Sequence, residues 1–351
     1  MTVPAFPAYP TVPHGGNLAQ AITQYGLPRA QWLDLSTGIN PNGYAVPAIS
    51  AETWLRLPDD HDGLDEIAAA YYAAPAALAV AGTQAAIQAL PRLLTPGVIG
   101  INLLTYGEYA PAFAAAGFSV ARYCTEATAE FTAGFVLTPG MTLPAHIRHL
   151  VVVNPNNPGT ELFSAADLLA WHAQLQARGG YLIVDEAFLD AQPAQSIAAH
   201  SALPGLIVLR SIGKFFGLAG ARVGFVLAQT PLLQALRSVL GPWSVAGPAR
   251  AVVRAALLDT AWQNATRPRL LADSQRLAQL LAAHGLPARH TALFAWVRSA
   301  RAAWWQDQLA QRGIWVRRFD HVPGLRFGLP ADDAAWARLH DAMQTIPATP
   351  H

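Results

Sequence analysis

The chain is almost devoid of lysine. Lys214, in the stretch RSIGKFFGLAGARVGF, is its one lysine, and every other residue among the 23 Lys and Arg is an arginine. Arginine can replace lysine in ion pairs and on surfaces, but it cannot lose its proton to become a nucleophilic amine. A buried lysine with a lowered pKa can do so and attack a carbonyl carbon. Because its neighbours are apolar or glycine, we interpret Lys214 as a reactive amine and not as a surface charge.

Cysteine, net charge and long apolar runs are also scarce. The one cysteine, Cys124, excludes an internal disulfide and a cysteine-based metal site, and we expect no metal. A net charge of +1 excludes general attraction to nucleic acid or to an acidic membrane. The uncharged span 67–90 is interrupted by proline, glycine and glutamine, which predicts packed helices and no membrane span. The N-terminus has no positively charged segment before an apolar run, so we expect no signal peptide and a cytoplasmic protein.

The apolar runs that are present indicate an α/β fold. They lie at 99–104, 149–154, 181–187, 205–211 and 222–228, with helical patterns between them. Buried strands separated by helices predict a mostly parallel central sheet flanked by helices. After about residue 245, one long helical region and then shorter strands and helices predict a smaller α+β domain. We therefore expect an extended N-terminal arm, or part of the small domain, at 1–45, a large domain at 46–245 and a small C-terminal domain at 246–351.

A lysine that attacks carbonyl carbons suggests pyridoxal phosphate as cofactor. This cofactor needs an amine, an acid against its pyridine nitrogen and an anion site for its phosphate. Asp185 ends the apolar run YLIVD, and ligands of open α/β sheets bind at the carboxyl ends of the strands. Asp185 is therefore the candidate for the acid, although an aspartate that caps a helix would look the same in isolation.

Polar residues near Lys214 are candidates for the phosphate site. Ser211 and Arg222 flank the lysine and offer a hydroxyl and a guanidinium to phosphate oxygens. Backbone N–H groups at a predicted strand-to-helix junction form a second anion site. The junction residues are Gly82, Thr83 and Gln84.

Two further residues are candidates for contacts with the cofactor ring. Asn157, in the turn NPNNPGT, can donate to the ring hydroxyl, or it can simply form the turn. Tyr106 can stack on the ring or pack in the core. The chain has neither a G-x-G-x-x-G motif nor a Walker A loop, so a nucleotide cofactor lacks its usual support.

In order and approximate spacing, this set resembles the fold-type I pyridoxal-phosphate enzymes of the aminotransferase class I/II superfamily. The residues that carry the resemblance are Asn157, Asp185, Ser211, Lys214 and Arg222. The resemblance implies that Lys214 binds the cofactor covalently, that Asp185 pairs with the pyridine nitrogen, and that Ser211 and Arg222 hold the phosphate. It also implies a homodimer with the site at the interface.

A narrower resemblance links the chain to the threonine-phosphate decarboxylases of cobalamin biosynthesis. HGGN at 14–17, LDLSTGINP at 33–41 and GPWSVAGPA at 241–249 are similar to segments of that family. The resemblance implies substrate contacts, with only a backbone contact at Gly38, where some members have asparagine. These residues are His14, Gly15, Gly38, Asn157, Arg317 and Arg326.

Two departures from related aminotransferases bear on the reaction. Relatives that use histidinol phosphate usually carry tyrosine where this chain has Leu57 and Phe188. The chain thereby loses two hydroxyl contacts to the cofactor, which argues against a plain aminotransferase.

The resemblance implies decarboxylation of L-threonine O-3-phosphate to (R)-1-amino-2-propanol O-2-phosphate for the cobalamin side chain. The alternative is an aminotransferase of the histidinol-phosphate type. In both cases the bond broken at Cα is the one held perpendicular to the cofactor ring, so anion sites that orient the substrate decide the outcome. The segment DDHD at 59–62 looks like a metal cluster, but we interpret it as a solvated turn.

Overall fold

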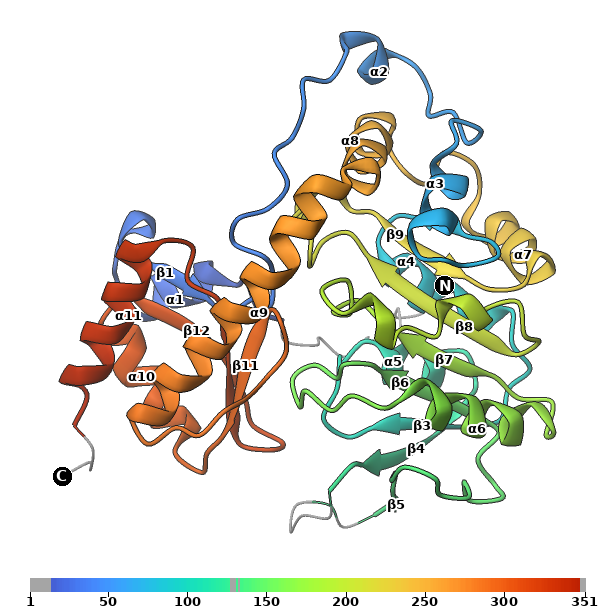
Figure 1. Ribbon diagram of the computed structural model, residues 1–351. Coiled ribbons are helices and arrows are strands. Elements are labelled where there is room, and N and C mark those ends of the chain that lie inside the picture. Colours follow the sequence, from blue (N-terminus) through green and yellow to red (C-terminus); the bar gives the residue numbers. More distant parts are fainter. Residues whose placement is uncertain (1–13, 127–130, 132, 348–351) are drawn as a thin grey trace, which may run out of the picture.

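The computed structural model describes residues 14–126, 131 and 133–347, so the first part of the predicted arm, 1–13, lies outside the described residues. Two β-sheets organise the chain, one of eight strands and one of five (Figure 1). Among the described residues, no helix has the length and apolar character needed to cross a membrane.

The large sheet forms from the middle of the chain. Its strands, in spatial order, are β2 (Leu78–Val80), β9 (Gly224–Leu227), β8 (Leu206–Ser211), β7 (Leu182–Asp185), β6 (His149–Val153), β3 (Val98–Asn102), β4 (Ser119–Cys124) and β5 (Phe135–Val136). Neighbours pair in parallel from β8 to β5, and only β9 runs antiparallel to β8 and β2. The predicted mostly parallel sheet is confirmed, and each of the five apolar runs contains one of its strands.

Both faces of this sheet are covered, which explains why its central strands are continuously apolar. Alternate residues of β6 enter two separate cores. Val151 and Val153 pack with α4 (Thr83–Ala89), α5 (Tyr109–Ala115) and α7 (Thr230–Leu240). Leu150 and Val152 pack on the other face with α6 (Ala165–Gln176) and α3 (Leu64–Tyr71).

The small sheet combines both ends of the chain. Its order is β1 (Leu33–Leu35), β12 (Ile314–Phe319), β13 (Gly324–Gly328), β11 (Phe294–Arg298) and β10 (Arg289–His290). β1 pairs in parallel with β12, whereas the other pairs are antiparallel. The helices α10 (Ala302–Gln311) and α11 (Asp333–Thr345) belong to the same part of the chain. The N-terminal segment therefore supplies one edge strand of a sheet that is otherwise C-terminal.

The expectation of an extended N-terminal arm is wrong for one segment. Leu18–Tyr25 forms the helix α1, capped by the Asn17 side chain and ended by Gly26 in the left-handed conformation (φ 73°). The many prolines of the first residues dominate the sequence pattern, but the span between the two caps contains none.

Two consecutive helices lead from one sheet to the other. α8 (Gly247–Leu258) packs against α3, and α9 (Thr260–Ala283) runs from there to β10 and β11 (Figure 1). We propose the division into an arm at 1–45, a large domain at 46–245 that holds the large sheet and a small domain at 246–351, whose sheet is completed by β1 of the arm.

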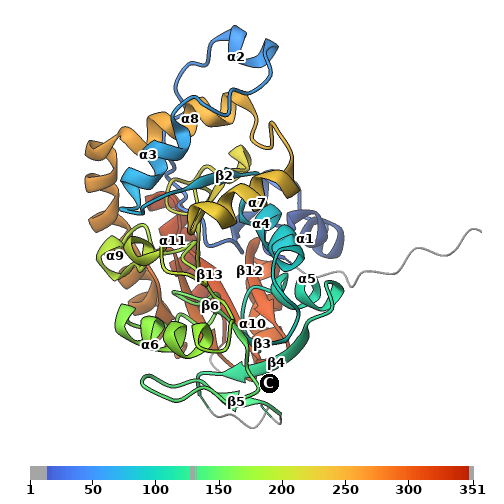
Figure 2. The same cartoon turned by 90° about the vertical axis from the view of Figure 1, so that its right-hand side faces the viewer.

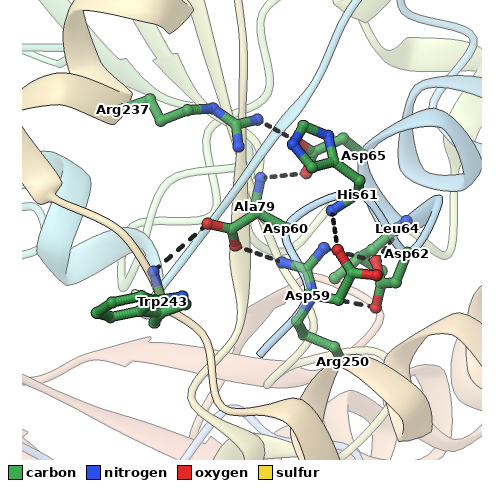
Figure 3. A network of polar contacts seen from close by, with 10 residues as sticks. All are labelled: Asp59, Asp60, His61, Asp62, Leu64, Asp65, Ala79, Arg237, Trp243 and Arg250. Atoms are coloured by element: carbon green, nitrogen blue, oxygen red, sulfur yellow. Dashed lines mark hydrogen bonds and ion pairs between the residues drawn. The ribbon is translucent and has the colours of Figure 1, made fainter. Parts of the chain in front are cut away.

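The acidic segment DDHD is more than a solvated turn, because it surrounds a buried arginine (Figure 3). Arg250 of α8 is only 3% exposed and donates to both carboxylate oxygens of Asp62, at 2.5 and 3.0 Å. Asp60 lies 3.5 Å from the same guanidinium. Among the described residues, no group of three or more His, Cys, Asp or Glu side chains is placed to hold a metal ion. The carboxylates therefore tie the turn to α8.

Replacing Arg250 with methionine should destabilise the fold by about 2 kcal/mol. The cost is below the roughly 3–5 kcal/mol of a fully buried pair because Asp60 and Asp62 keep some solvent contact. Urea denaturation measures it. The control is Arg56→Ala, which breaks the exposed pair with Glu52 and should change stability by less than about 0.5 kcal/mol. Equal effects of the two variants would contradict a structural role for Arg250.

Candidate active site

The predicted cofactor residues meet at one edge of the large sheet. β2, β3, β6, β7 and β8 all run in the same direction, so their carboxyl ends lie together. The antiparallel strand β9 begins at that edge. The residues placed there are Gly82 to Gln84 after β2, Tyr106 after β3, Asn157 after β6, Asp185 at the end of β7, Ser211 and Lys214 at and after β8, and Arg222 before β9.

Lys214 lies in a largely apolar environment with charged groups nearby. Its Nζ is 5.4 Å from the centre of the Phe188 ring. Its backbone carbonyl accepts a hydrogen bond from the Asn40 N–H, which brings the N-terminal segment beside it. Burial, followed by the positive charge of Arg326, lowers the pKa of the lysine to about 8, although the Asp185 carboxylate opposes this. A substantial fraction of the amine is therefore neutral near physiological pH.

Asp185 is held by a partner that the sequence did not reveal. Its Oδ2 accepts a hydrogen bond of 2.7 Å from the Tyr109 hydroxyl, and its Oδ1 accepts one from the Ala187 N–H at 3.0 Å. Burial raises the pKa of Asp185, while these hydrogen bonds and the Lys214 charge oppose the rise. The carboxylate is thus oriented from two sides, close to the lysine, and it fits a protonated pyridine nitrogen.

Tyr109→Phe should lower kcat about tenfold with little change in KM, because the lost donor leaves Asp185 less well oriented and less favoured as an anion. Tyr109 is fully buried, and phenylalanine fills nearly the same volume. The comparison variant is Tyr123→Phe, which removes a buried hydroxyl that donates to the Val151 carbonyl, away from the site. A tenfold loss in both variants would indicate a general packing effect.

The phosphate candidates form a compact set of donors. Gly82 has a positive φ of 74° and lies against Arg222, and a Cβ at this position would stand 2.9 Å from an Arg222 guanidinium nitrogen. Arg222 itself adopts the left-handed conformation (φ 53°), which is rare for a residue with a side chain and typical of functional sites. The Ser211 hydroxyl has no hydrogen-bond partner among the described residues. These donors fit a phosphate group.

Tyr106 and Gln84 contact each other directly. The Tyr106 hydroxyl donates to Gln84 Oε1 at 3.0 Å, and burial raises the pKa of Tyr106 to about 12, so it remains a donor. The amide of Gln84 donates in turn to Glu108 Oε2 at 2.9 Å. The Gln84 side chain therefore orients Tyr106. Only the backbone N–H of Gln84 remains as a candidate donor to a phosphate.

On the substrate side, the structure brings together residues from distant parts of the chain. Arg326 of β13 donates to Asn157 Oδ1 and to the Ser36 carbonyl, each at 2.6 Å. With its oxygen occupied, the Asn157 side chain has its NH₂ group left to donate. The Nε of Arg326 is buried without a hydrogen-bond partner among the described residues. Gly15 packs against Ser36 and Arg326, where a Cβ would not fit.

Arg317 and Arg318 are separated as the alternation of a strand requires. Arg317 donates to the His14 carbonyl at 3.3 Å and lies opposite Arg326 in the pairing of β12 with β13. Arg318 forms an ion pair with Asp320. The His14 ring contacts the Glu108 carboxylate at 2.6 Å. The structure therefore brings His14, Arg317 and Arg326 into one region, and Arg317 is the arginine of the pair that faces it.

An apolar wall replaces the hydroxyl missing at Phe188. The Phe188 and Phe294 rings pack edge to face with centroids 5.1 Å apart. Gly38 lies against both, and a Cβ there would come within 2.9 Å of Phe294. An asparagine at this position would collide with the wall, which explains the glycine. Leu57, the second departure, is 68% exposed and lies on the protruding segment around α2 (Ala51–Leu55).

The donor set fits pyridoxal phosphate: an amine of lowered pKa, an oriented carboxylate, and a hydroxyl and guanidinium for a phosphate. Sequence reasoning missed Tyr109, Glu108 and Ser36. Tyr109 is the first residue of α5, in the segment that follows the carboxyl end of β3, and that position was the local signal for one of them.

The chain is similar to known proteins over most of its length. Residues 48–339 match the family model for aminotransferase class I and II. The chain is 52% identical to the threonine-phosphate decarboxylase of Pseudomonas aeruginosa, over 94% of this chain and 96% of the relative. It is 42% identical to the threonine-phosphate decarboxylase of a Sinorhizobium species, over 94% of this chain and 97% of the relative. The histidinol-phosphate aminotransferase from Sinorhizobium meliloti in complex with pyridoxal-5'-phosphate matches with a TM-score of 0.76 at 19% identity, over 93% of this chain and 94% of that one, which shows a common fold.

Proposed function

The chain belongs to the class I and II aminotransferase family, and from this we propose that it decarboxylates L-threonine O-3-phosphate to (R)-1-amino-2-propanol O-2-phosphate. Its cofactor is pyridoxal phosphate. The observation that carries the proposal is the near full-length likeness to relatives named for this reaction. The clustered cations of the substrate side support it.

We propose the following roles at the cofactor. Lys214 binds it covalently, Asp185 faces its ring nitrogen, Asn157 its ring oxygen, and Ser211, Arg222 and the backbone of Gly82 to Gln84 its phosphate. Tyr106 lies beside the ring. When bound to the substrate amine, the cofactor supplies an electron sink for the bond that breaks at Cα.

The substrate carries a carboxylate and a phosphate, and the chain offers cations for both. Arg326 and Arg317 are adjacent across two strands, and His14 lies beside Arg317. The groups that fix two anions also fix the rotation about the bond between the amine nitrogen and Cα. These residues would therefore select the bond that breaks by fixing the orientation of the substrate carboxylate. The rings of Phe188 and Phe294, which form the apolar wall, carry no polar group that could bind the substrate.

Lys214 is also the group that can return a proton to Cα after CO₂ has left. With a pKa of about 8, its Nζ holds a proton in part of the molecules near neutral pH and can release it without a large cost. Burial and the Arg326 charge lower the pKa of this amine, and the Asp185 charge raises it.

A kinetic assay separates decarboxylation from the rival aminotransferase of histidinol-phosphate type. The enzyme is incubated with O-phosphothreonine, with and without an oxo acid, and CO₂ and keto acid are measured. We expect CO₂ at the same rate in both samples. Formation of a keto acid that depends on the added oxo acid would overturn the proposal. The same assay with histidinol phosphate should give no turnover.

We also propose that the chain acts in cobalamin side-chain synthesis, in the cytoplasm, as a homodimer. The support for the dimer is the segment around α2, which projects from the body (Figure 2). Its apolar side chains are exposed, which is rare on a monomer surface: Val46 by 64%, Trp54 by 70%, Leu55 by 85% and Leu57 by 68%. Sedimentation should give twice the 37.4 kDa of the chain, and a monomer at micromolar concentration would contradict this.

A further inference from the structure

Glu108 connects the N-terminal segment that contains His14 to the cofactor side of the site, where Gln84 lies. It lies directly before α5, and its side chain is only 16% exposed. Its Oε1 contacts His14 Nε2 at 2.6 Å, and its Oε2 accepts from the Gln84 amide at 2.9 Å. Since Gln84 also holds the Tyr106 hydroxyl, one carboxylate joins the cofactor side of the pocket to the N-terminal segment.

That segment also contacts the small sheet. Gly16 donates its N–H to the Ser36 hydroxyl at 2.8 Å. Arg317 donates to the His14 carbonyl at 3.3 Å, and Gly15 packs against the Ser36 carbonyl and Arg326. The segment therefore spans from the small sheet, beside the anion-binding arginines, to Glu108 at the edge of the large sheet.

The contact with Glu108 also fixes the His14 ring. A carboxylate at 2.6 Å accepts a hydrogen bond, so Nε2 is the nitrogen that donates. Nδ1 is left without a hydrogen bond among the described residues. The ring lies 5.8 Å from the Tyr106 ring, centroid to centroid, which restricts it from a second side. His14 thus presents one defined nitrogen instead of turning freely, as a largely exposed histidine otherwise would.

We propose that Glu108 is a positioning residue: it holds His14, and with it Gly15, at the substrate side of the site, so that His14 and Arg317 bind the phosphate group of the substrate together. The inference rests on the proposed function for the identity of that group. Glu108 itself contacts no substrate. Its loss therefore weakens binding more than it slows the chemical step.

The test is a double-mutant cycle of Glu108→Gln and His14→Ala. Glutamine keeps the shape of the side chain but removes its charge. Affinity for 1-amino-2-propanol 2-phosphate, measured by calorimetry on the holoenzyme, should fall about tenfold in either single variant. The double variant should be no worse than the single ones, because both remove the same contact. KM for O-phosphothreonine should rise by a similar factor, with a smaller fall in kcat. Glu108→Asp should recover part of the affinity.

The control is Glu126→Gln. Glu126 forms an ion pair with Arg289 at the same 2.6 Å, and it also links the large sheet to the small one. It contacts none of the proposed site residues, so the affinity and KM of this variant should equal those of the wild type.

Three results separate the outcomes. Unchanged affinity in Glu108→Gln, or additive losses in the double variant, would overturn the inference. If the variants show the predicted coupling in ligand affinity but the wild-type enzyme releases no CO₂, only the proposed function is overturned. Failure of the wild type to bind the ligand would overturn both.

Discussion

Replacing Lys214 with alanine should lower the decarboxylation rate by about four orders of magnitude or more. With the roles proposed for Lys214, the variant loses both the amine that binds the cofactor and the group that carries the proton to Cα. Lys214→Arg should be equally inactive, although it keeps a positive charge, because a guanidinium does not release its proton at physiological pH. CO₂ release from O-phosphothreonine measures both variants. Activity of Lys214→Arg within tenfold of the wild type would show that charge alone is needed.

The absence of any other lysine makes a chemical control unusually clear. Borohydride reduction of the holoenzyme, followed by peptide mass spectrometry, should place the cofactor's mass on the peptide that contains Lys214. Neither variant should carry the label on a side chain. Circular dichroism and thermal unfolding should show both variants folded.

Asp185→Asn should lower kcat by about 10²–10³, since a neutral amide cannot stabilise a protonated ring nitrogen as a carboxylate does. The asparagine oxygen can still accept from the Ala187 N–H, and its NH₂ group can donate to the Tyr109 hydroxyl oxygen in place of the lost bond. Burial raises the pKa of the Asp185 carboxyl, so the charged form is costly in this position. We therefore expect the variant to be at least as stable as the wild type.

Thermal unfolding and steady-state kinetics measure the two effects of Asp185→Asn separately. Loss of activity with unchanged or higher stability is the signature of a functional charge held at a cost to the fold. A variant that keeps the wild-type rate but unfolds more easily would assign Asp185 a structural role only.

The sequence allowed prediction of those features that are local or set by chain direction. The composition singled out Lys214, and the apolar runs predicted five of the eight strands of the large sheet. Because the carboxyl ends of parallel strands share one edge, Asp185 and Ser211 could be expected to lie together from the sequence alone. These arguments need only the period of a strand and the direction of the chain.

The contacts that complete the site could not be predicted in this way. Tyr109 and Asp185 are 76 positions apart, and His14 and Glu108 are 94 apart. No local pattern specifies such a pair, since each residue also suits an ordinary helix start or turn. The same applies to Arg250 and Asp62, 188 positions apart, whose contact changed the interpretation of the acidic turn. Helix α1 was missed because the prolines before it obscured a short span with good caps at both ends.

The central claim is that this chain breaks the bond between Cα and the carboxylate of O-phosphothreonine. The most direct measurement is NMR of the reaction with substrate carrying ¹³C in the carboxylate, in D₂O and without any oxo acid. The account predicts that the label appears as CO₂ and bicarbonate, in equal amount to a 1-amino-2-propanol 2-phosphate that carries one solvent deuteron at C1. Retention of the label in a keto acid, or exchange of the Cα hydrogen without loss of the label, would contradict it.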